Sequence, residues 1–158
     1  MAASGGKSKF RLSQPQVLFW RLSDAVRQYR QHRILTPSAA LGRRGEDLAH
    51  RFLQRSGFVV ICRNYRTSSG DAELDIVARD NDILVFVEVK SRASTDFGAP
   101  DRAIDPEKQK NIVRAARSYA ARAGVNWDRV RFDVVSIVFT NPPAIVHHQD
   151  VFFEGRTH

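Results

Sequence analysis

The chain has 158 residues, which is enough for one domain of ordinary size but too few for two. Hydrophobic residues make up 42% of the chain and charged residues 27%, a balance that excludes an intrinsically disordered protein. No apolar run approaches the ~20 residues of a membrane helix, and the single cysteine, Cys62, excludes an intramolecular disulfide and a cysteine-cluster zinc site. We therefore expect a cytoplasmic globular protein without a membrane segment.

The net charge of +8 and the isoelectric point near 10.4 come mostly from one part of the chain. Residues 1–40 hold seven Lys and Arg residues against one acid, Asp24, whereas residues 41–158 hold eighteen against sixteen acids. Such an excess of positive charge favours binding to a polyanion such as nucleic acid. A solubilising tail explains the same composition, and charge alone does not decide between the two.

The first 37 residues are predicted to form a basic arm. Residues 1–14 are small, polar and basic, and residues 15–33 repeat apolar side chains at the spacing of an amphipathic helix. Residues 35–38 are predicted to be a linker, after which the folded domain occupies 40–158.

The folded domain is predicted to be of the α/β class, with the element order α-β-β-β-α-β-β. The first helix, over 41–56, ends before Gly57, and the second, over 106–123, is capped by Asp105 and ends at Gly124. Strands are expected over 58–62, 72–79, 83–91, 131–139 and 144–153. The turn at 80–82 joins the second and third strands into a hairpin.

The third strand is apolar on both faces for most of its length, which predicts a central strand covered on both sides. Two charged residues, Glu88 and Lys90, lie on the same face near its end. Ionised groups at the margin of a core are costly unless they are paired or bound to a metal. These two side chains therefore mark a candidate site.

The register of the hairpin brings a second carboxylate to this site. If the turn centres on residues 81–82, Asp75 lies opposite Glu88, and opposed carboxylates repel unless a cation lies between them. Ligands made only of oxygen suit Mg²⁺ or Mn²⁺. The same register sets Glu73 opposite Lys90, so a cross-strand salt bridge is the competing structural interpretation. A slip of one residue would separate the two carboxylates.

A third acid, Glu46, lies at the boundary of the apolar face of the first helix, in the expected first turn. It is a candidate to join the site, although the helix dipole also favours acids in first turns. A metal held by such carboxylates polarises a phosphodiester and lowers the pKa of a bound water. Lys90 would orient that water, neutralise developing charge or act as a base, and the sequence does not choose among these roles.

Asp75, twelve further residues and then Glu88-Val89-Lys90 resemble the signature of the PD-(D/E)XK nuclease superfamily. Four blocks together resemble the bacterial YraN family of predicted endonucleases, which is distantly similar to archaeal Holliday junction resolvases. They are LGRRGEDLA at 41–49, ELDIV at 73–77, LVFVEVKSR at 84–92 and RFDVV at 131–135. The resemblance covers about residues 40–154, and the four blocks together are far more specific than the short signature.

The resemblance implies a restriction-endonuclease-like core, a mixed sheet flanked by helices, to which the basic arm is an extension. It assigns the metal-ligand role to Glu46, Asp75 and Glu88 and the catalytic lysine role to Lys90, with Mg²⁺ or Mn²⁺ as the cofactor. The implied activity is hydrolysis of phosphodiester bonds in DNA. Branched or junction DNA is a candidate substrate and a homodimer a candidate assembly, because junction resolvases work as dimers, and the sequence itself shows no dimer interface. The chain departs from the pattern at Leu74, where the superfamily motif has proline, and at Ala72, where many family members have glycine.

Basic residues near these motifs are candidates for supporting the site or binding nucleic acid. In the superfamily a Lys or Gln on the second core helix often supports the site, and here Lys108 and Gln109 stand in its first turn, with a slight preference for Gln109. The candidate phosphate contacts, for which a plain solvated surface is the alternative, are Arg43, Arg44, Lys110, Arg114 and Arg117.

The remaining side chains of note favour structural roles. Asp133 is interpreted as structural, Trp127 as a packing residue, His147 and His148 as surface residues, Cys62 as buried and inert, and Phe152 and Phe153 as a cover for the sheet or an interface. The leading functional hypothesis is a metal-dependent endonuclease. A nucleic-acid-binding or complex-forming protein that does not cleave is the alternative, followed by a protein-interaction module recruited through the arm.

Overall fold

The computed structural model describes residues 36–70, 72–93 and 104–151. The predicted helix at 15–33, the rest of the arm up to residue 35, the loop expected at 97–100 and the pair Phe152 and Phe153 lie outside these residues. None of the helices in the described ranges is long and apolar enough to cross a membrane.

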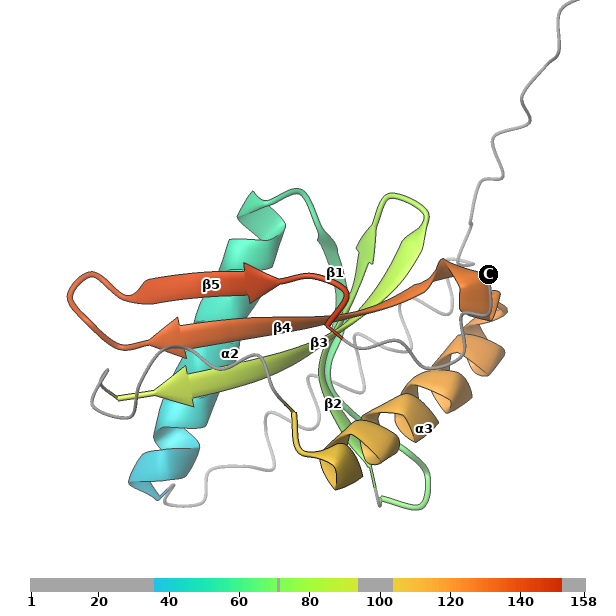
Figure 1. Ribbon diagram of the computed structural model, residues 1–158, viewed down its shortest axis with the longest axis horizontal. Coiled ribbons are helices and arrows are strands. Elements are labelled where there is room, and N and C mark those ends of the chain that lie inside the picture. The colour runs from blue at the N-terminus through green and yellow to red at the C-terminus, as the bar shows by residue number, and fades with distance from the viewer. Residues whose placement is uncertain (1–35, 71, 94–103, 152–158) are drawn as a thin grey trace, which may run out of the picture.

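The described chain forms one five-stranded mixed sheet with a helix on each face (Figure 1). The elements are α2 (Pro37–Arg55), β1 (Val59–Arg66), β2 (Glu73–Asp80), β3 (Ile83–Arg92), α3 (Pro106–Ala123), the short 3-10 helix η1 (Trp127–Arg129), β4 (Val130–Val138) and β5 (Ala144–His148). The strand order is β1-β2-β3-β4-β5, in which only the β3–β4 pair is parallel. The predicted fold class and element order are therefore confirmed.

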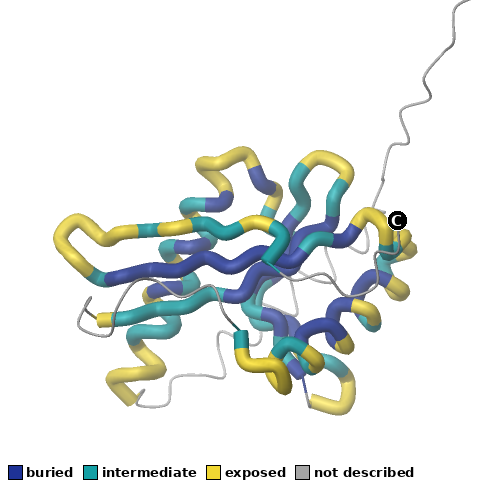
Figure 2. Tube along the Cα trace, viewed as in Figure 1, coloured by how far each residue is buried: buried dark blue, intermediate teal, exposed yellow. Residues whose placement is uncertain are grey.

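The central position predicted for β3 is also confirmed. Its side chains alternate between two cores, and buried residues are dark blue in Figure 2. Val85 and Val87 pack with Ala49 and Leu53 of α2 on one face. Leu84 and Phe86 pack on the other face, beneath α3, in a core that also includes the buried Cys62 and is bordered by Trp127. The buried position of Cys62 and the packing role of Trp127 are as predicted.

Helix α2 begins earlier than its sequence pattern indicated. Thr36 is its N-cap and accepts a hydrogen bond from the N–H of Ala39 at 3.3 Å, with Pro37 in the first helical position. The linker expected at 35–38 is therefore wrong for its last two residues, Pro37 and Ser38, which are helical. Glu46 consequently lies well inside the helix rather than in its first turn, so the helix dipole does not account for its presence.

Helix α3 and the β2–β3 hairpin match the predictions closely. The carboxylate of Asp105 accepts hydrogen bonds from the N–H groups of Glu107 and Lys108, both at 3.1 Å, and Gly124 ends the helix with φ of +65°. Only glycine adopts that backbone conformation without steric cost. The hairpin register is the predicted one, with Ile76 opposite Val87 and Asp80 opposite Ile83.

Two strands differ in length from the predictions. The first strand continues to Arg66 instead of ending at Cys62, and it contains a β-bulge between Val60 and Cys62 that the hydrophobic pattern did not reveal. The last strand ends at His148 rather than at residue 153, and Asp150 follows with φ of +55°.

A buried polar network joins β4 to β5. The carboxylate of Asp133 is fully buried and accepts hydrogen bonds from Arg131 at 2.9 and 3.0 Å, from His147 at 2.8 Å and from the N–H of Asp150 at 3.1 Å. Asp133 therefore has the structural role predicted for it. The surface position expected for His147 is wrong: only 11% of its side chain is exposed, because the ring packs against Phe52 and bonds to Asp133.

Candidate active site where two strands separate

The candidate site lies where β2 and β3 separate. Their ladder of hydrogen bonds ends at the Ile76–Val87 pair. In Figure 1 the first residues of β2 lie toward the bottom of the picture, whereas the last residues of β3 lie toward the left. The next residue of β2 toward its start is Asp75, whose Oδ2 accepts a hydrogen bond from the N–H of Val89 at 2.8 Å. The side chain of Asp75 thus replaces a backbone partner for β3 at this point.

Glu88 is the buried acid of the site, with only 6% of the residue exposed. Its Oε1 forms an ion pair with the Nζ of Lys108, from the first turn of α3. The N-cap bonds of Asp105 fix that turn, and through it the origin of the Lys108 side chain. Of the two residues considered as support, Lys108 is therefore the one whose side chain is seen to contact a candidate ligand.

The electrostatics of the site favour the binding of a cation. Burial, followed by the negative charge of Glu88, raises the pKa of Asp75 well above its ordinary value, while the hydrogen bond from Val89 acts in the opposite direction. Burial acts to lower the pKa of Lys108, but the contact with Glu88 and the charge of Asp75 prevail and raise it. Two carboxylates and one ammonium group therefore interact in a partly desolvated place.

Glu46 contributes a third carboxylate from α2. Its Oε2 accepts hydrogen bonds from the side-chain amide of Asn64 at 3.0 Å and from Arg63 at 3.3 Å, and Arg63 also binds Asp47 at 2.6 Å. The side chain of Glu46 is 18% exposed, and its charge contributes to raising the pKa of Asp75.

The neighbouring glycine brings α2 close to the sheet. A Cβ atom on Gly45 would lie 1.7 Å from the hydroxyl oxygen of Ser91, at the end of β3. Only a residue without a side chain fits there, so Gly45 fixes how closely Glu46 approaches the strand that carries Glu88.

Lys90 and Glu73 lie beyond the end of the β2–β3 ladder, which is the Ile76–Val87 pair, so the ladder does not set them opposite each other as predicted. Lys90 is half-buried on β3, two residues beyond Glu88 and opposite Ser136 of β4. Glu73 forms a salt bridge with Arg66 of β1, at 2.9 Å, which joins the paired strands β1 and β2. The ladder therefore gives no support for the cross-strand salt bridge expected between Glu73 and Lys90.

The residues fit a divalent cation in their chemistry but require rearrangement to bind it. Within the described part of the chain, no group of three His, Cys, Asp or Glu side chains is arranged to hold a metal ion. Glu88 faces Lys108, and Glu46 faces Asn64 and Arg63. The donor set is nonetheless one of carboxylate oxygens only, which suits Mg²⁺ or Mn²⁺, and an ammonium group already contacts one of them.

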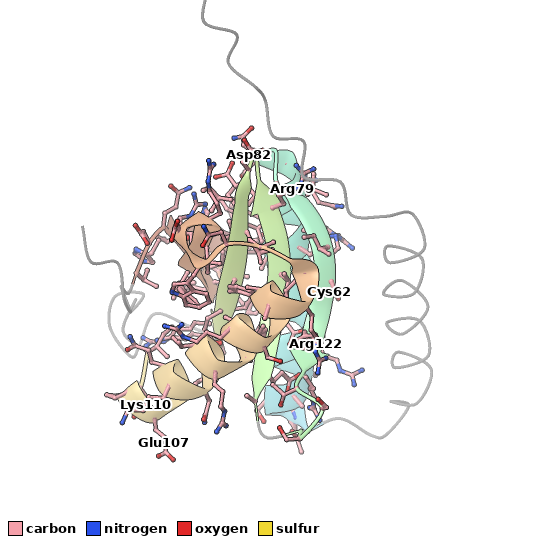
Figure 3. All side chains as sticks on the ribbon, turned by 90° about the vertical axis from the view of Figure 1, so that its right-hand side faces the viewer. Cys62, Arg79, Asp82, Glu107, Lys110 and Arg122 are labelled. Carbon is pink, nitrogen blue, oxygen red and sulfur yellow. The ribbon has the colours of Figure 1, made fainter. Side chains whose placement is uncertain are left out.

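The candidate phosphate contacts differ in their surroundings. The guanidinium of Arg117 lies 4.3 Å from the ring centroid of Trp127, and that of Arg44 lies 4.8 Å from the ring centroid of Phe139. Arg114 donates to Asn111 at 3.1 Å, Lys110 is exposed and Arg43 is half-buried. In Figure 3, Lys110 lies near Glu107 at one end of the molecule and Asp82 at the other.

Arg63, Asn64 and Gly45 were not among the site residues predicted from the sequence. Arg63 and Asn64 lie just beyond the strand predicted over 58–62, and nothing in their local pattern linked them to Glu46. The two glycines of the block at 41–49 were the available signal for Gly45, because glycine inside a helix is unfavourable unless a close contact requires it.

These features define an α/β domain with a candidate centre of carboxylates and lysines at the separation of two strands. Residues 45–137 match the profile described as "Uncharacterised protein family UPF0102". A UPF0102 protein of Solibacter usitatus is 53% identical over 104 residues, which cover 66% of this chain and 79% of the relative. One of Geobacter sulfurreducens is 45% identical over 114 residues, covering 71% and 88%. The chain therefore belongs to the UPF0102 family, which confirms the resemblance to the YraN family.

Proposed function

We propose that the protein is a metal-dependent endonuclease that hydrolyses phosphodiester bonds in DNA. The observation that carries this proposal is the pair of acids at the strand separation: Asp75 with a raised pKa beside Glu88, with the Lys108 ammonium against the latter. A fold gains no stability from two carboxylates held together in a partly desolvated place, so a cation-dependent function is the better explanation. The excess of basic residues is consistent with a polyanionic substrate.

Each side chain has a distinct part in this proposal. Asp75, Glu88 and Glu46 would hold Mg²⁺ or Mn²⁺, which would supply Lewis-acid chemistry at the phosphate. The N–H of Val89 keeps Asp75 oriented. Lys90, on the same strand as Glu88, would stabilise charge on the phosphate oxygens or orient the attacking water. Lys108 would neutralise Glu88 until the cation binds.

The test is a cleavage screen with the full chain on single-stranded, duplex and branched DNA, with Mg²⁺ or Mn²⁺. We expect the wild type to cleave at least one of these substrates. EDTA and the Glu88→Gln substitution should each abolish this cleavage. The matched control is Asp82→Asn, an exposed acid in the turn of the same hairpin, which should cleave like the wild type. Cleavage that is indifferent to EDTA and to Glu88→Gln would contradict the proposal.

A second candidate is a DNA-binding protein that does not cleave. The ion pair between Lys108 and Glu88 favours it, because an acid whose charge is already neutralised does not need a metal. This alternative predicts salt-dependent DNA binding that survives Glu88→Gln and weakens when residues 1–35 are removed. Whether the homodimer implied by the resemblance exists is a separate proposal, which sedimentation of the protein with and without branched DNA would test.

The two candidates differ in what Lys108→Met does to cation binding. If Lys108 holds the place of a metal, removing its charge should increase Mn²⁺ affinity about fivefold, because about 1 kcal/mol of repulsion is removed from a half-exposed group. Titration followed by electron paramagnetic resonance measures this directly. Lys110→Met, which removes an exposed charge two residues away, should change the affinity little. A lower affinity in Lys108→Met would contradict competition between this lysine and the metal.

A further inference from the structure

The first strand contains two backbone irregularities beside the candidate site. A β-bulge between Val60 and Cys62 shifts its register against β2 by one residue. Two residues further on, Asn64 has φ of +51°, in the left-handed region that residues other than glycine rarely adopt. Bulges and left-handed residues of this kind tend to persist where they aim a side chain for function.

The irregularities turn two adjacent side chains toward the same helix. Cys62 and Tyr65 both belong to the core beneath α3, although strand alternation would place residues three apart on opposite faces. Arg63 and Asn64, between them, both reach α2, where each donates a hydrogen bond to Glu46. A regular strand would direct only one of the two to that helix.

The bulge also sets which residue of β1 lies beside Asp75. Beyond the bulge, Arg63 pairs with Ile76 and Tyr65 with Leu74, so Asn64 occupies the position opposite Asp75. Without the extra residue, the register before the bulge would continue and Arg63 would take that position. Asn64 and Asp75 therefore occupy facing positions on β1 and β2, and the amide of Asn64 connects this pair to Glu46 on the helix.

We propose that Asn64 is a positioning residue that holds Glu46 for divalent-cation binding with Asp75 and Glu88. This inference rests on the proposed metal-dependent function. The Asn64 amide and the Arg63 guanidinium both bind Oε2 of Glu46, and this fixes the orientation of the carboxylate. Hydrogen-bonded carboxylates of this kind bind metals more tightly than freely rotating ones because the ligand is already oriented.

A purely structural role for Asn64 predicts different behaviour. In that case the residue would serve only to adopt the left-handed backbone, and its amide would be incidental. Asn64→Gly separates the two roles, because glycine adopts φ of +51° at no steric cost but has no side chain to bind Glu46. Asn81→Gly is the matched control, since Asn81 has φ of +52° and is exposed in the turn between β2 and β3.

The experiment is Mn²⁺ titration of the full-length protein by electron paramagnetic resonance, with thermal unfolding of each variant. We expect Asn64→Gly to bind Mn²⁺ about 10- to 100-fold more weakly, the usual cost of losing a side chain that orients a ligand, with little change in melting temperature. Asn81→Gly should match the wild type in both measurements. Unchanged affinity in Asn64→Gly would overturn the positioning role.

Two further results keep the inference and the proposed function separable. Asn64→Asp retains the shape and tolerates the left-handed backbone but cannot donate to Glu46, so it too should bind weakly, and wild-type affinity would overturn the inference even if the glycine variant did not fold. If the wild type binds no Mn²⁺, or binds Mn²⁺ as tightly as Asp75→Asn does, the proposed function fails and the inference fails with it. If the wild type binds and both Asn64 variants bind equally well, only the inference fails.

Discussion

Replacing Asp75 with asparagine should stabilise the metal-free protein while abolishing cleavage. Burial, and then the charge of Glu88, raises the pKa of Asp75, so its ionised form is disfavoured in the folded state. A carboxyl group whose pKa is raised by folding contributes stability below its unfolded pKa, and this contribution is lost as the pH rises through the folded value. At neutral pH, which lies above the unfolded pKa, the carboxyl group of Asp75 therefore destabilises the fold relative to a neutral side chain. Asparagine is neutral and its oxygen can still accept the bond from Val89.

The free energy of unfolding of Asp75→Asn should exceed that of the wild type by about 1 kcal/mol at neutral pH, the common size of a stabilising substitution at a functional site. The loss of cleavage should be about 10³-fold or more, because a metal contributes several kcal/mol of transition-state stabilisation. Urea unfolding in EDTA at several pH values measures the first effect, and the stability advantage should shrink below the unfolded pKa of the aspartate. Asp82→Asn serves as the surface control. An Asp75→Asn protein less stable than the wild type at neutral pH would contradict this account of the site.

The largest loss of stability should follow from Arg131→Met. The guanidinium of Arg131 bonds to the fully buried Asp133 and also to Asp80, at 3.0 Å. Removing it leaves a buried carboxylate with part of its charge uncompensated, which costs about 3–5 kcal/mol. Arg129→Met, an exposed residue two positions earlier, should have little effect. The measurement is the free energy of unfolding in urea, and a loss below about 1 kcal/mol would contradict the importance of the network.

The pH dependence of this network has the opposite sign to that of Asp75. Burial alone would raise the pKa of Asp133, but the hydrogen bonds from His147 and Arg131 and the N–H of Asp150 hold it below its ordinary value. The stability that the Asp133 carboxylate contributes is present above its pKa in the unfolded chain and is lost as the pH falls through its pKa in the folded protein. The difference between wild type and Arg131→Met should therefore narrow in strong acid.

The parts of the fold that local rules determine could be predicted from the sequence. Asp105 and Gly124 are strong signals for the two ends of a helix, and the turn at 80–82 sets the hairpin register on which the approach of Asp75 to Glu88 depends. The alternation of β3 between two cores followed from its apolar pattern.

What could not be predicted depends on contacts between distant segments. The approach of Lys108 to Glu88 is set by how α3 packs on the sheet. Lys108 and Gln109 are adjacent in one turn and differ in the direction in which their side chains leave the helix, so the sequence alone does not show which of them reaches the site. The left-handed backbone of Asn64 has no signature that distinguishes it from an ordinary strand asparagine, yet it decides which side chains reach Glu46. The burial of His147 follows from its bond to Asp133, on a neighbouring strand.

The central claim is that Asp75 and Glu88 bind one divalent cation together. The most direct test is Mn²⁺ binding by electron paramagnetic resonance to the wild type, Asp75→Asn, Glu88→Gln and the control Asp82→Asn. We expect one site in the wild type and the control, and loss of that site in each of the other two variants. Mn²⁺ binding that persists unchanged in both variants, or no binding by the wild type, would contradict the claim.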